Sequence, residues 1–418
     1  MPLDRARTSV DRLREIARGT LRLDAPPLTI DADEALELFE SQLRCRMIDV
    51  ESHALRARGQ GFYTICSAGH EGNVALGRAT HIDDPALLHY RSGAFYIERA
   101  RKDRKVDPVL DLLLSLAASA DDPISGGRHK VFGSAALHIP PQTSTIASHL
   151  PKAVGIAVAI ERTKRLGLPL HRADDAIVVC SFGDASLNHS TALGAMNAAS
   201  WVAFQKLPAP VLFVCEDNAL GVSVRTPDGW VEARMRAMPG IAYIAADGSN
   251  LSETVHATKR AVDLCRLSRA PVFLHLKCQR LWGHAGSDLD GEYRTQAEVA
   301  AAEARDPVAM TAQTLLDAAV VDAHKLLSMV AWAEQRVLDR SADAVTRSKL
   351  ATREAVVASI APSRDEEVFA EARREGYAPM PKDADKKRPL GLAIRAGLTD
   401  LMHKYPEMLL FGEDVAQK

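Results

Sequence analysis

The amino-acid sequence predicts an α/β fold in which a parallel sheet is flanked by helices, with a helical C-terminal extension. Strand-like and helical stretches alternate from about residue 62 to residue 308, which is the order that parallel strand–helix–strand units produce. The strand-like runs are almost continuously apolar, as in strands that are buried on both faces. With 418 residues, of which 47% are hydrophobic, the chain is long enough to bury one large core.

The individual elements follow from their apolar spacing. A first helix is expected over residues 31–58, where apolar residues recur at helical spacing behind an acidic start. Between the later strands, helices are expected over residues 191–205 and 251–267. The second of these begins with Asn250 and Glu253 at the spacing of a capping box. The expected buried strands are residues 176–182, 210–216, 241–247 and 271–278.

The strand signal stops after about residue 308, and this divides the chain into four expected parts. These are an N-terminal helical segment (1–60), a ligand-binding α/β domain (61–310), a helical extension with a charged, proline-bearing linker (311–388), and a fresh apolar pattern (389–418). The last part predicts one helix followed by one strand, which cannot bury a core of their own. We therefore expect that the chain is the front part of a longer protein, or that this segment docks onto another chain.

Charge and cysteine usage narrow the class of protein. A net charge of -2 gives no electrostatic reason to expect a nucleic-acid or anionic-membrane partner. The N-terminus carries charges throughout and no apolar run reaches membrane-spanning length. The six cysteines form no CxxC pair, and several stand within strand-like runs, as buried thiols in a reducing compartment do. These features predict a cytoplasmic protein.

Oxygen-bearing side chains follow two of the expected strands. Asp184 comes directly after the first, between the small residues Gly183 and Ala185, and Glu216, Asp217 and Asn218 come after the second. Ligands of such sheets bind beyond the carboxyl ends of the strands. A carboxylate, an amide oxygen and a nearby backbone carbonyl are ligands that Mg2+ accepts, and small neighbours let the backbone approach a diphosphate. A helix beginning near Ser186 would also direct free N–H groups at such an anion.

The same residues have a simpler interpretation. Asp184 could cap the following helix, and Asn218 could begin a turn, since both residue types favour those positions. Short glycine motifs also produce many false matches. The two strand ends by themselves leave both interpretations open.

Five segments in a fixed order resolve this ambiguity through a resemblance. Together with "GDAS…CEDNALG", they resemble the alpha part of the thiamin diphosphate-dependent decarboxylating component of 2-oxo acid dehydrogenase complexes, of the branched-chain and pyruvate types. The order and spread of these segments are more specific than any one of them. The segments are "GFYTICSAGHEG" (61–72), "LLHYRSGAF" (87–95), "TSTIASHLPKAVG" (143–155), "RLWGHAGSD" (280–288) and "DPV" (306–308).

The resemblance implies a thiamin diphosphate-binding fold and a set of site residues. Asp184, Asn218 and the carbonyl of Leu220 would hold Mg2+, and Ile146 would bend the cofactor. His284 would orient the reaction intermediate, and His129, in a segment that is a mobile active-site loop in relatives, is a second catalytic candidate. The implied cofactor-binding residues are Tyr90, Arg91, Ser144, Ile146, Gly183, Ala185, Asn188, Asn218 and His284. Ala185 replaces the third glycine of the family motif, and Asp217 replaces its first asparagine.

The implied reaction is oxidative decarboxylation of a 2-oxo acid, with branched-chain acids favoured over pyruvate. The acyl group would pass to a lipoylated dihydrolipoyl acyltransferase, and a two-fold assembly such as a homodimer is expected. Residues 389–418 resemble the opening of the family's beta part, so a beta-type subunit or a longer beta half would complete the site. The glutamate that activates the cofactor in the family lies further into beta and has no counterpart that we can assign.

Two alternatives stay open at this point. The chain could be an acetoin dehydrogenase or a transketolase-like thiamin enzyme, although "RLWGHAGSD" favours the dehydrogenase. It could also bind the cofactor and serve only as an inactive scaffold subunit, because the beta half is incomplete. Other histidines that could line the pocket, each more readily explained as structural, are His70, His138 and His149; Glu71 is a further pocket candidate.

Overall fold

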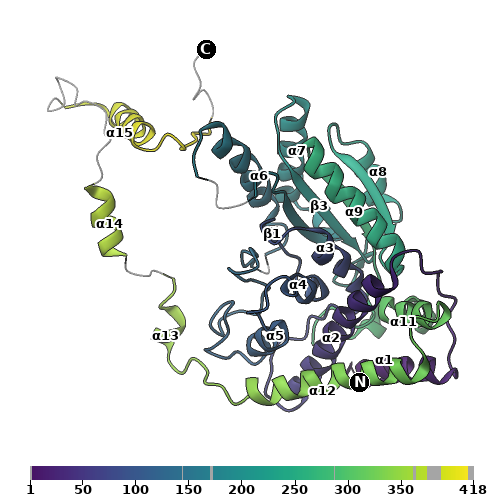
Figure 1. Ribbon diagram of the computed structural model, residues 1–418. Coiled ribbons are helices and arrows are strands. Elements are labelled where there is room, and N and C mark those ends of the chain that lie inside the picture. The colour runs from purple at the N-terminus through teal and green to yellow at the C-terminus, as the bar shows by residue number, and fades with distance from the viewer. Residues whose placement is uncertain are drawn as a thin grey trace. The chain divides into compact units, whose positions relative to one another are not determined.

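A five-stranded sheet forms the centre of the fold in the computed structural model of the chain (Figure 1). The strands follow the order β1-β2-β3-β7-β6, and every neighbouring pair is parallel. The predicted class, a parallel sheet flanked by helices, is therefore confirmed. The strands are β1 (Ala86–Leu87), β2 (Val178–Gly183), β3 (Val211–Asp217), β6 (Ala242–Asp247) and β7 (Val272–Lys277).

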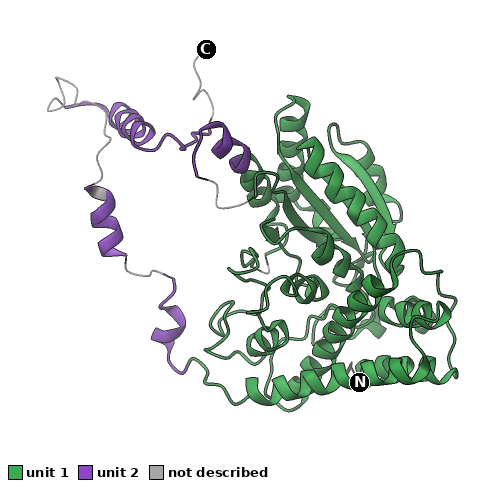
Figure 2. Cartoon of the chain, in the orientation of Figure 1, with its two compact units in different colours: residues 1–158, 172–350 green, residues 159–171, 351–418 purple. Residues whose placement is uncertain are grey.

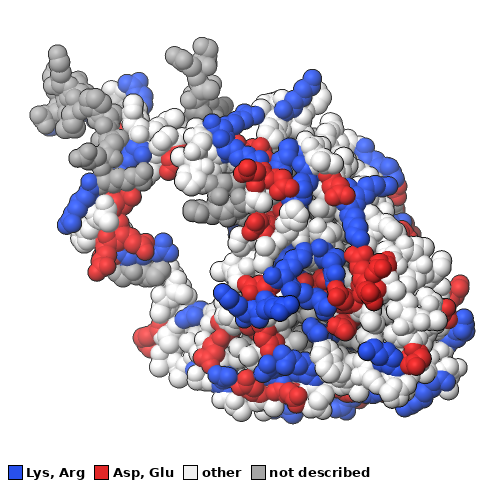
Figure 3. Space-filling view, in the orientation of Figure 1, with Lys and Arg blue, Asp and Glu red and all other residues white. Residues whose placement is uncertain are grey.

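The structure describes most of the chain. The described residues are 2–143, 145–169, 173–286, 288–360, 364–373 and 387–412. Within them, no helix has both the length and the apolar character needed to cross a bilayer. Basic and acidic side chains are intermixed over the face shown in Figure 3.

Helices make up most of the rest of the chain. The helix α9 (Leu251–Ser268) packs against β3, β6 and β7, and α3 (Val74–Ala79) packs against α9 (Figure 1). A second layer begins with α2 (Ala32–Ala57), which contacts α3. The others are α1 (Pro2–Arg18), α4 (Gly93–Ala100), α5 (Pro108–Leu116), α6 (Leu150–Arg165), α7 (Ser190–Phe204), α8 (Trp230–Arg236), α10 (Gln296–Ala304), α11 (Pro307–Asp317), α12 (Ala323–Ala344), α13 (Arg353–Val357), α14 (Asp365–Ala372) and α15 (Leu390–Lys404).

Short elements connect these helices and strands near the sheet. Three are single 3-10 turns, and two are strands that pair antiparallel away from the main sheet. They are η1 (Glu71–Asn73), η2 (Asp184–Asn188), η3 (Asp290–Glu292), β4 (Leu220–Gly221) and β5 (Val224–Arg225).

Local chemistry explains where the main helices begin. The side chain of Asp31 accepts a hydrogen bond from the backbone N–H of Glu34 and starts α2, as its acidic start predicts. Asn250 starts α9 in the same way, accepting from the N–H of Glu253 at 3.2 Å. The Glu253 carboxylate accepts from the N–H of Asp247 at 2.9 Å. The first hydrogen bond of the predicted capping box is therefore present, and the second comes from the N–H of Asp247 where a capping box would use that of Asn250.

The expected helix start near Ser186 is wrong. The chain leaves β2 in the 3-10 turn η2, and the α-helix α7 begins only at Ser190, where His189 provides the side-chain cap. The side chain of Asp184 caps neither helix.

The described residues fall into two compact units, shown in Figure 2. The first unit comprises residues 1–158 and 172–350 and contains the whole sheet, and the second comprises residues 159–171 and 351–418. This division differs from the four predicted parts, because α1, α2, α11 and α12 bury apolar faces in one core with α9 and the sheet. Within the second unit, Lys404 donates to the backbone oxygen of Glu371 at 2.7 Å. No described strand follows α15 up to residue 412; the rest of that prediction lies outside the described residues.

A buried ion triad ties the helical layer to the sheet side of the first unit. The guanidinium group of Arg46, on α2, donates to Glu71 at 2.8 Å and to both oxygens of Asp306 at 2.6 and 2.8 Å. Asp306 is the N-cap of α11, and Glu71 opens η1 and also accepts from the N–H of Gly69. These side chains are almost completely buried, so each charge depends on its partners.

Replacing Arg46 is therefore expected to destabilise the fold. We expect Arg46→Met to lower the free energy of unfolding by about 3–5 kcal/mol, because it leaves two carboxylates buried without their cation. Urea denaturation followed by circular dichroism measures this change. The control, Arg236→Met, removes an exposed ion pair with Glu232 and should cost less than about 1 kcal/mol. Equal effects of the two substitutions would contradict this account.

Candidate functional site

The ends of β2 and β3 bring the predicted metal ligands to one cavity. The strands pair in a register that places Gly183 opposite Glu216, so Asp184 and Asn218 follow at the same edge of the sheet. A cavity of about 340 Å3 opens there, and both side chains line it. Its position beyond the carboxyl ends of parallel strands is the usual position of ligands in such folds.

Most of the predicted site residues line this cavity. Asn188 does not: it is exposed at the end of η2. His129 is also exposed and outside the lining, so its catalytic role stays a prediction. Ser144 lies outside the described residues. The predicted residues that line the cavity are Tyr90, Arg91, Ile146, Gly183, Asp184, Ala185, Asn218, Leu220 and His284.

Asp184 has the environment of an unneutralised metal ligand. Its side chain is buried, and one carboxylate oxygen accepts the hydroxyl of Thr226. Burial, together with the nearby negative charge of Asp217, raises the pKa of Asp184 to about 6. A divalent cation in the cavity would remove both causes, because it replaces lost solvation with direct coordination. The donor set of Asp184, Asn218 and the Leu220 carbonyl thus fits Mg2+.

Hydrogen bonds fix which atom of Asn218 faces the cavity. The amide nitrogen of Asn218 lies 2.9 Å from Nε2 of His70, and Nδ1 of the same ring lies 2.8 Å from a carboxylate oxygen of Glu216. Burial, with the charges of Arg91 and Arg280, holds the pKa of His70 well below its usual range, so the ring is neutral. Nδ1–H therefore donates to Glu216, and Nε2 accepts from Asn218. The amide oxygen, which also accepts from the N–H of Leu220 at 3.2 Å, is left for a cation.

Glu216 connects the side chain of Asn218 to two other segments of the chain. The oxygen that accepts from His70 also accepts from the amide of Asn73, at 3.2 Å. Its other oxygen accepts from the hydroxyl of Ser92, also at 3.2 Å, next to the predicted pair of Tyr90 and Arg91. A single buried carboxylate therefore sets the relative positions of Asn218 and of the segment that carries Tyr90 and Arg91.

The loop that carries Asn218 and Leu220 is held in a strained shape. Ala219 and Val222 have φ values of 60° and 59°, a conformation that residues with side chains rarely adopt. Arg280 donates to the carbonyl of Val222 at 2.7 Å and helps to hold it. The loop also packs tightly on Ala185: a Cβ atom at Gly221 would lie 2.6 Å from the Ala185 methyl group. Gly221 thus accommodates the alanine that replaces the third glycine of the motif.

His284 lies on the other side of the cavity, in contact with Arg91. The guanidinium group of Arg91 lies 3.2 Å from Nδ1 of His284 and 3.3 Å from its carbonyl oxygen. It also donates to the carbonyl of Cys66. Burial, with the charges of Arg91 and Arg280, lowers the pKa of His284 to about 4. His284 is therefore neutral near pH 7, with Nδ1 accepting from Arg91 and Nε2–H free to donate.

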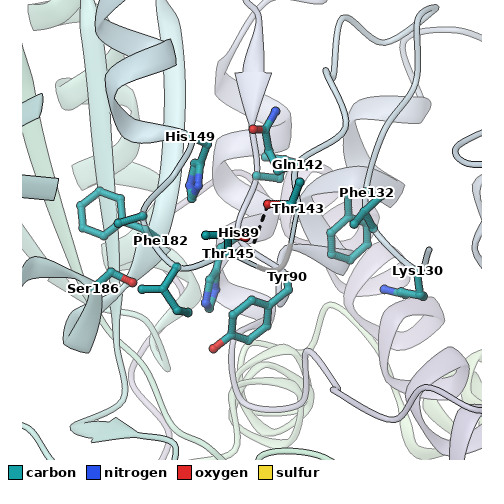
Figure 4. Close-up of a pocket in the computed structure, with 14 residues that line it drawn as sticks. His89, Tyr90, Lys130, Phe132, Gln142, Thr143, Thr145, His149, Phe182 and Ser186 are labelled. Carbon is teal, nitrogen blue, oxygen red and sulfur yellow. Dashed lines mark hydrogen bonds between the residues drawn. The ribbon is translucent and has the colours of Figure 1, made fainter. Parts of the chain in front are cut away.

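A smaller pocket adjoins the cavity, and Figure 4 shows its lining. It shares His89, Tyr90, Ile146 and Ser186 with the larger cavity. His149 lines it, and one of its ring nitrogens contacts the carbonyl of Ser181 at 2.8 Å. His138, by contrast, lines neither of these two spaces.

Sequence reasoning missed some of the residues that build the site. Thr226, which contacts Asp184, follows β5 and stands outside the segment "CEDNALG" (215–221), so no sequence signal indicates it. The sequence suggests His70 only as a pocket-lining or structural residue, whereas its ring contacts the side-chain amide of Asn218 from behind the cavity wall. Glu71 was also a pocket candidate, but it belongs to the buried triad with Arg46 and does not line the cavity.

One further group of side chains has the spacing of a metal site. His70, Glu216 and Cys278 place ligand atoms within 4.8 Å of one another, and all three are buried. Both ring nitrogens of His70 are already engaged, with Glu216 and Asn218. Burial and the neighbouring carboxylates also raise the pKa of Cys278, which disfavours the thiolate that binds metals. We therefore interpret this group as structural.

Comparison with known proteins agrees with this geometry. Residues 40–353, more than half of the chain, match the family described as "Dehydrogenase E1 component". The chain belongs to this family. The class defined by the fold and the site is thus that of the alpha-type E1 component of 2-oxo acid dehydrogenases, as the resemblance predicted.

Particular relatives are distant and of two kinds. The chain is 24% identical over 357 residues to the human "Pyruvate dehydrogenase E1 component subunit alpha, testis-specific form, mitochondrial". The aligned region covers 81% of this chain and 84% of that protein. It is 25% identical over 293 residues to the mouse "2-oxoisovalerate dehydrogenase subunit alpha, mitochondrial", covering 68% of this chain and 61% of the relative. The chain therefore spans less than two thirds of the mouse relative's length.

The role of His70 can be tested through metal affinity. We expect His70→Leu to weaken Mg2+ binding in the presence of thiamin diphosphate by about 10- to 100-fold, because Asn218 loses the partner that orients it. His70→Gln is the matched control, since its amide can still donate to Glu216 and accept from Asn218. Isothermal titration calorimetry measures both affinities, with circular dichroism as the test of folding. Unchanged affinity in a folded His70→Leu variant would contradict the assignment.

The protonation state of His284 gives a pH prediction. Its pKa in the folded protein, about 4, lies below the ordinary value of 6.5, so the native protein binds this proton more weakly than the unfolded chain does. The contribution of neutral His284 to the free energy of unfolding is fully present above about pH 6.5, and it is lost as the pH falls toward 4. Histidine NMR should show a ring titrating near pH 4 that disappears in His284→Asn. A midpoint near 6.5 for that ring would refute the prediction.

Proposed function

We propose that the chain provides the diphosphate-binding half of a thiamin diphosphate-dependent dehydrogenase that oxidatively decarboxylates a 2-oxo acid. The observation that carries this proposal is the single cavity that joins Asp184 and Asn218 to Arg91 and His284. Family membership supports the cofactor, because the resemblance implies thiamin diphosphate together with Mg2+. When bound, this cofactor supplies a thiazolium ring that accepts the electron pair released with carbon dioxide.

The residues of the chain would bind the cation, orient the reacting group and donate a hydrogen bond to it. Asp184, the Asn218 amide oxygen and the Leu220 carbonyl would hold the cation, which would supply positive charge to the diphosphate. Ile146 and Tyr90 border both the cavity and the smaller pocket, so they would contact the part of the cofactor that lies beyond the diphosphate. His284, neutral and oriented by Arg91, presents Nε2–H to an oxygen of the reacting acyl group.

Branched-chain 2-oxo acids are the proposed substrates, in preference to pyruvate. Relatives of both kinds match the chain with nearly the same identity. The aliphatic side chains of Ile65, Ile146 and Val222 line the cavity and give an apolar environment for a branched substrate. A lipoylated dihydrolipoyl acyltransferase is the proposed acyl acceptor, and the cytoplasm the proposed location.

A beta-type subunit or segment is the proposed partner that completes the site, within a two-fold assembly. Asp184 is the only carboxylate among the described residues that line the cavity, and it is assigned to the cation. The glutamate that activates the cofactor would therefore come from the partner. α15 also exposes apolar side chains, including Leu390, Ile394 and Met402, which suits a segment that packs against another chain.

The test is a binding and activity measurement on the full chain, with and without a beta-type partner. Thiamin diphosphate binding with Mg2+ is measured first. Decarboxylation of 3-methyl-2-oxobutanoate and of pyruvate is then followed with an artificial electron acceptor. Cofactor binding with faster turnover of the branched acid is expected. No cofactor binding even with the partner would contradict the proposal, and binding without turnover of any 2-oxo acid would favour a scaffold subunit.

Asp184 gives the sharpest single substitution for this proposal. We expect Asp184→Asn to reduce Mg2+-dependent cofactor affinity at least about 100-fold, because the amide cannot supply the negative charge that the cation requires. Asp228→Asn, at an exposed position outside the cavity lining, should leave the affinity unchanged. Calorimetry on the two folded variants makes the comparison. Equal cofactor affinities of the two variants would contradict the assignment of Asp184 as a cation ligand.

A further inference from the structure

Lys130 stands beside the cavity and is not part of the site described above. It lines the smaller pocket of about 30 Å3 that shares Tyr90 and Ile146 with the main cavity, and it is the only lysine or arginine among the described lining residues. It also lines a second small pocket, of about 20 Å3, which meets the main cavity at Ile65. Lys130 therefore lies where both small pockets approach the cavity. Figure 4 shows its amino group directed into the first of them.

The amino group of Lys130 has no oxygen partner among the described residues. Its nitrogen lies 4.1 Å from the ring centre of Phe132 and 5.4 Å from that of Tyr63, so aromatic faces surround it. The Asp49 carboxylate lines the second small pocket together with Lys130, and one of its oxygens accepts from the N–H of Ser67 at 2.8 Å. Burial lowers the pKa of Lys130, with Asp49 opposing that effect. A partly desolvated ammonium group of this kind is stabilised by an anion that enters the pocket.

The rest of the pocket also contains polar groups without partners. Gln142 Oε1 and His149 Nδ1 are buried and have no hydrogen-bond partner among the described residues. Thr143 also lines this pocket, and its hydroxyl oxygen accepts from the N–H of Thr145 at 3.2 Å. Buried polar atoms are nearly always satisfied in folded proteins, so these groups indicate a space that a ligand or water occupies.

The position of the Lys130 pocket relative to Asp184 and Asn218 indicates which anion it would bind. The diphosphate belongs to the end of the cavity formed by Asp184 and Asn218, and neither residue lines the pocket of Lys130. Ile146 and Tyr90 lie between these two places and border both. A 2-oxo acid carries its carboxylate one bond from the carbonyl carbon that reacts. Its carboxylate is small enough to enter a pocket that adjoins the reacting end.

We propose that Lys130 binds the carboxylate of the 2-oxo acid substrate, an inference that rests on the proposed function. The carboxylate is the group that leaves as carbon dioxide, so this ion pair forms in the bound substrate and weakens as the carbon–carbon bond breaks. Lys130 therefore contributes to substrate capture and selects for the acid over neutral ketones. Interactions made equally or more strongly in the ground state change KM and do not raise kcat.

The first test is kinetic and uses the full chain with its beta-type partner. We expect Lys130→Met to raise the KM for 3-methyl-2-oxobutanoate by about 10- to 100-fold, the effect of losing one charged hydrogen bond. The kcat value should change far less, and Lys130→Arg should restore part of the affinity. Lys325→Met, an exposed lysine at the start of α12, is the matched control and should be neutral. An unchanged KM in a folded Lys130→Met variant would overturn the proposal.

The second test measures binding without turnover. Calorimetry on the full chain with its partner, without thiamin diphosphate, compares 3-methyl-2-oxobutanoate with its neutral methyl ester. Lys130→Met should weaken binding of the acid and leave that of the ester unchanged; equal loss for both ligands would overturn the proposal. Cofactor affinity is measured in parallel. If wild-type protein binds no cofactor, the proposed function fails; if it binds cofactor and turns over the acid while Lys130→Met behaves as wild type, only the role of Lys130 fails.

Discussion

The carboxylate of Glu216 is the interaction on which the site depends. It is fully buried at the end of β3, and it accepts hydrogen bonds from His70, Asn73 and Ser92. Burial raises the pKa of Glu216, while His89 and the hydrogen bonds from Asn73 and Ser92 oppose that shift. Because a buried carboxylate is costly unless its partners are all in place, the three segments that supply them are held in one arrangement. Through His70 this arrangement reaches Asn218.

The two sides of the cavity wall differ in how well their polar groups are satisfied. Behind the wall, Glu216, His70 and the Arg46 triad pair completely. Facing the cavity, Asp184 has a raised pKa, and in the adjoining smaller pocket Lys130 has no oxygen partner among the described residues. Side chains that lack a hydrogen-bond or charge partner in the protein indicate positions where a ligand provides that partner. A preorganised site needs such side chains on its surface and a rigid hydrogen-bonded support behind them. The strained loop at Ala219 and Val222 belongs to the same pattern.

The sequence predicts the sheet well and its surroundings less well. β2, β3 and β7 are continuous apolar runs and are buried along nearly their whole length, as expected, whereas β1 has only two residues and gives no such signal. The expectation that residues 241–247 are buried on both faces is wrong, because β6 is an edge strand on which Ala242 and Ala245 are exposed. The helix start after Asp184 was placed too early because the sequence does not distinguish a 3-10 turn from the first turn of an α-helix. The division into units was also missed. The apolar faces of α11 and α12 pack on α2, and no local pattern reveals which core a helix joins.

Within the site, residues fixed by a motif were predicted and residues fixed by tertiary contact were not. Asp184, Asn218 and His284 stand in recognisable segments, and they line one cavity. Thr226 and His70 act through contacts between segments that are far apart in the chain, so single-sequence reasoning had no means to pair them with their partners. Lys130 carries no sequence signal, because its position beside the cavity follows from tertiary packing that a single sequence does not reveal.

The central claim is that the carboxyl ends of β2 and β3 hold a cation for a diphosphate. Anomalous diffraction from crystals grown with Mn2+ and thiamin diphosphate tests this most directly. We expect one strong peak at about 2.1 Å from a carboxylate oxygen of Asp184, the amide oxygen of Asn218 and the Leu220 carbonyl. A peak at the cluster of His70, Glu216 and Cys278, or cofactor density without a metal at Asp184, would contradict it.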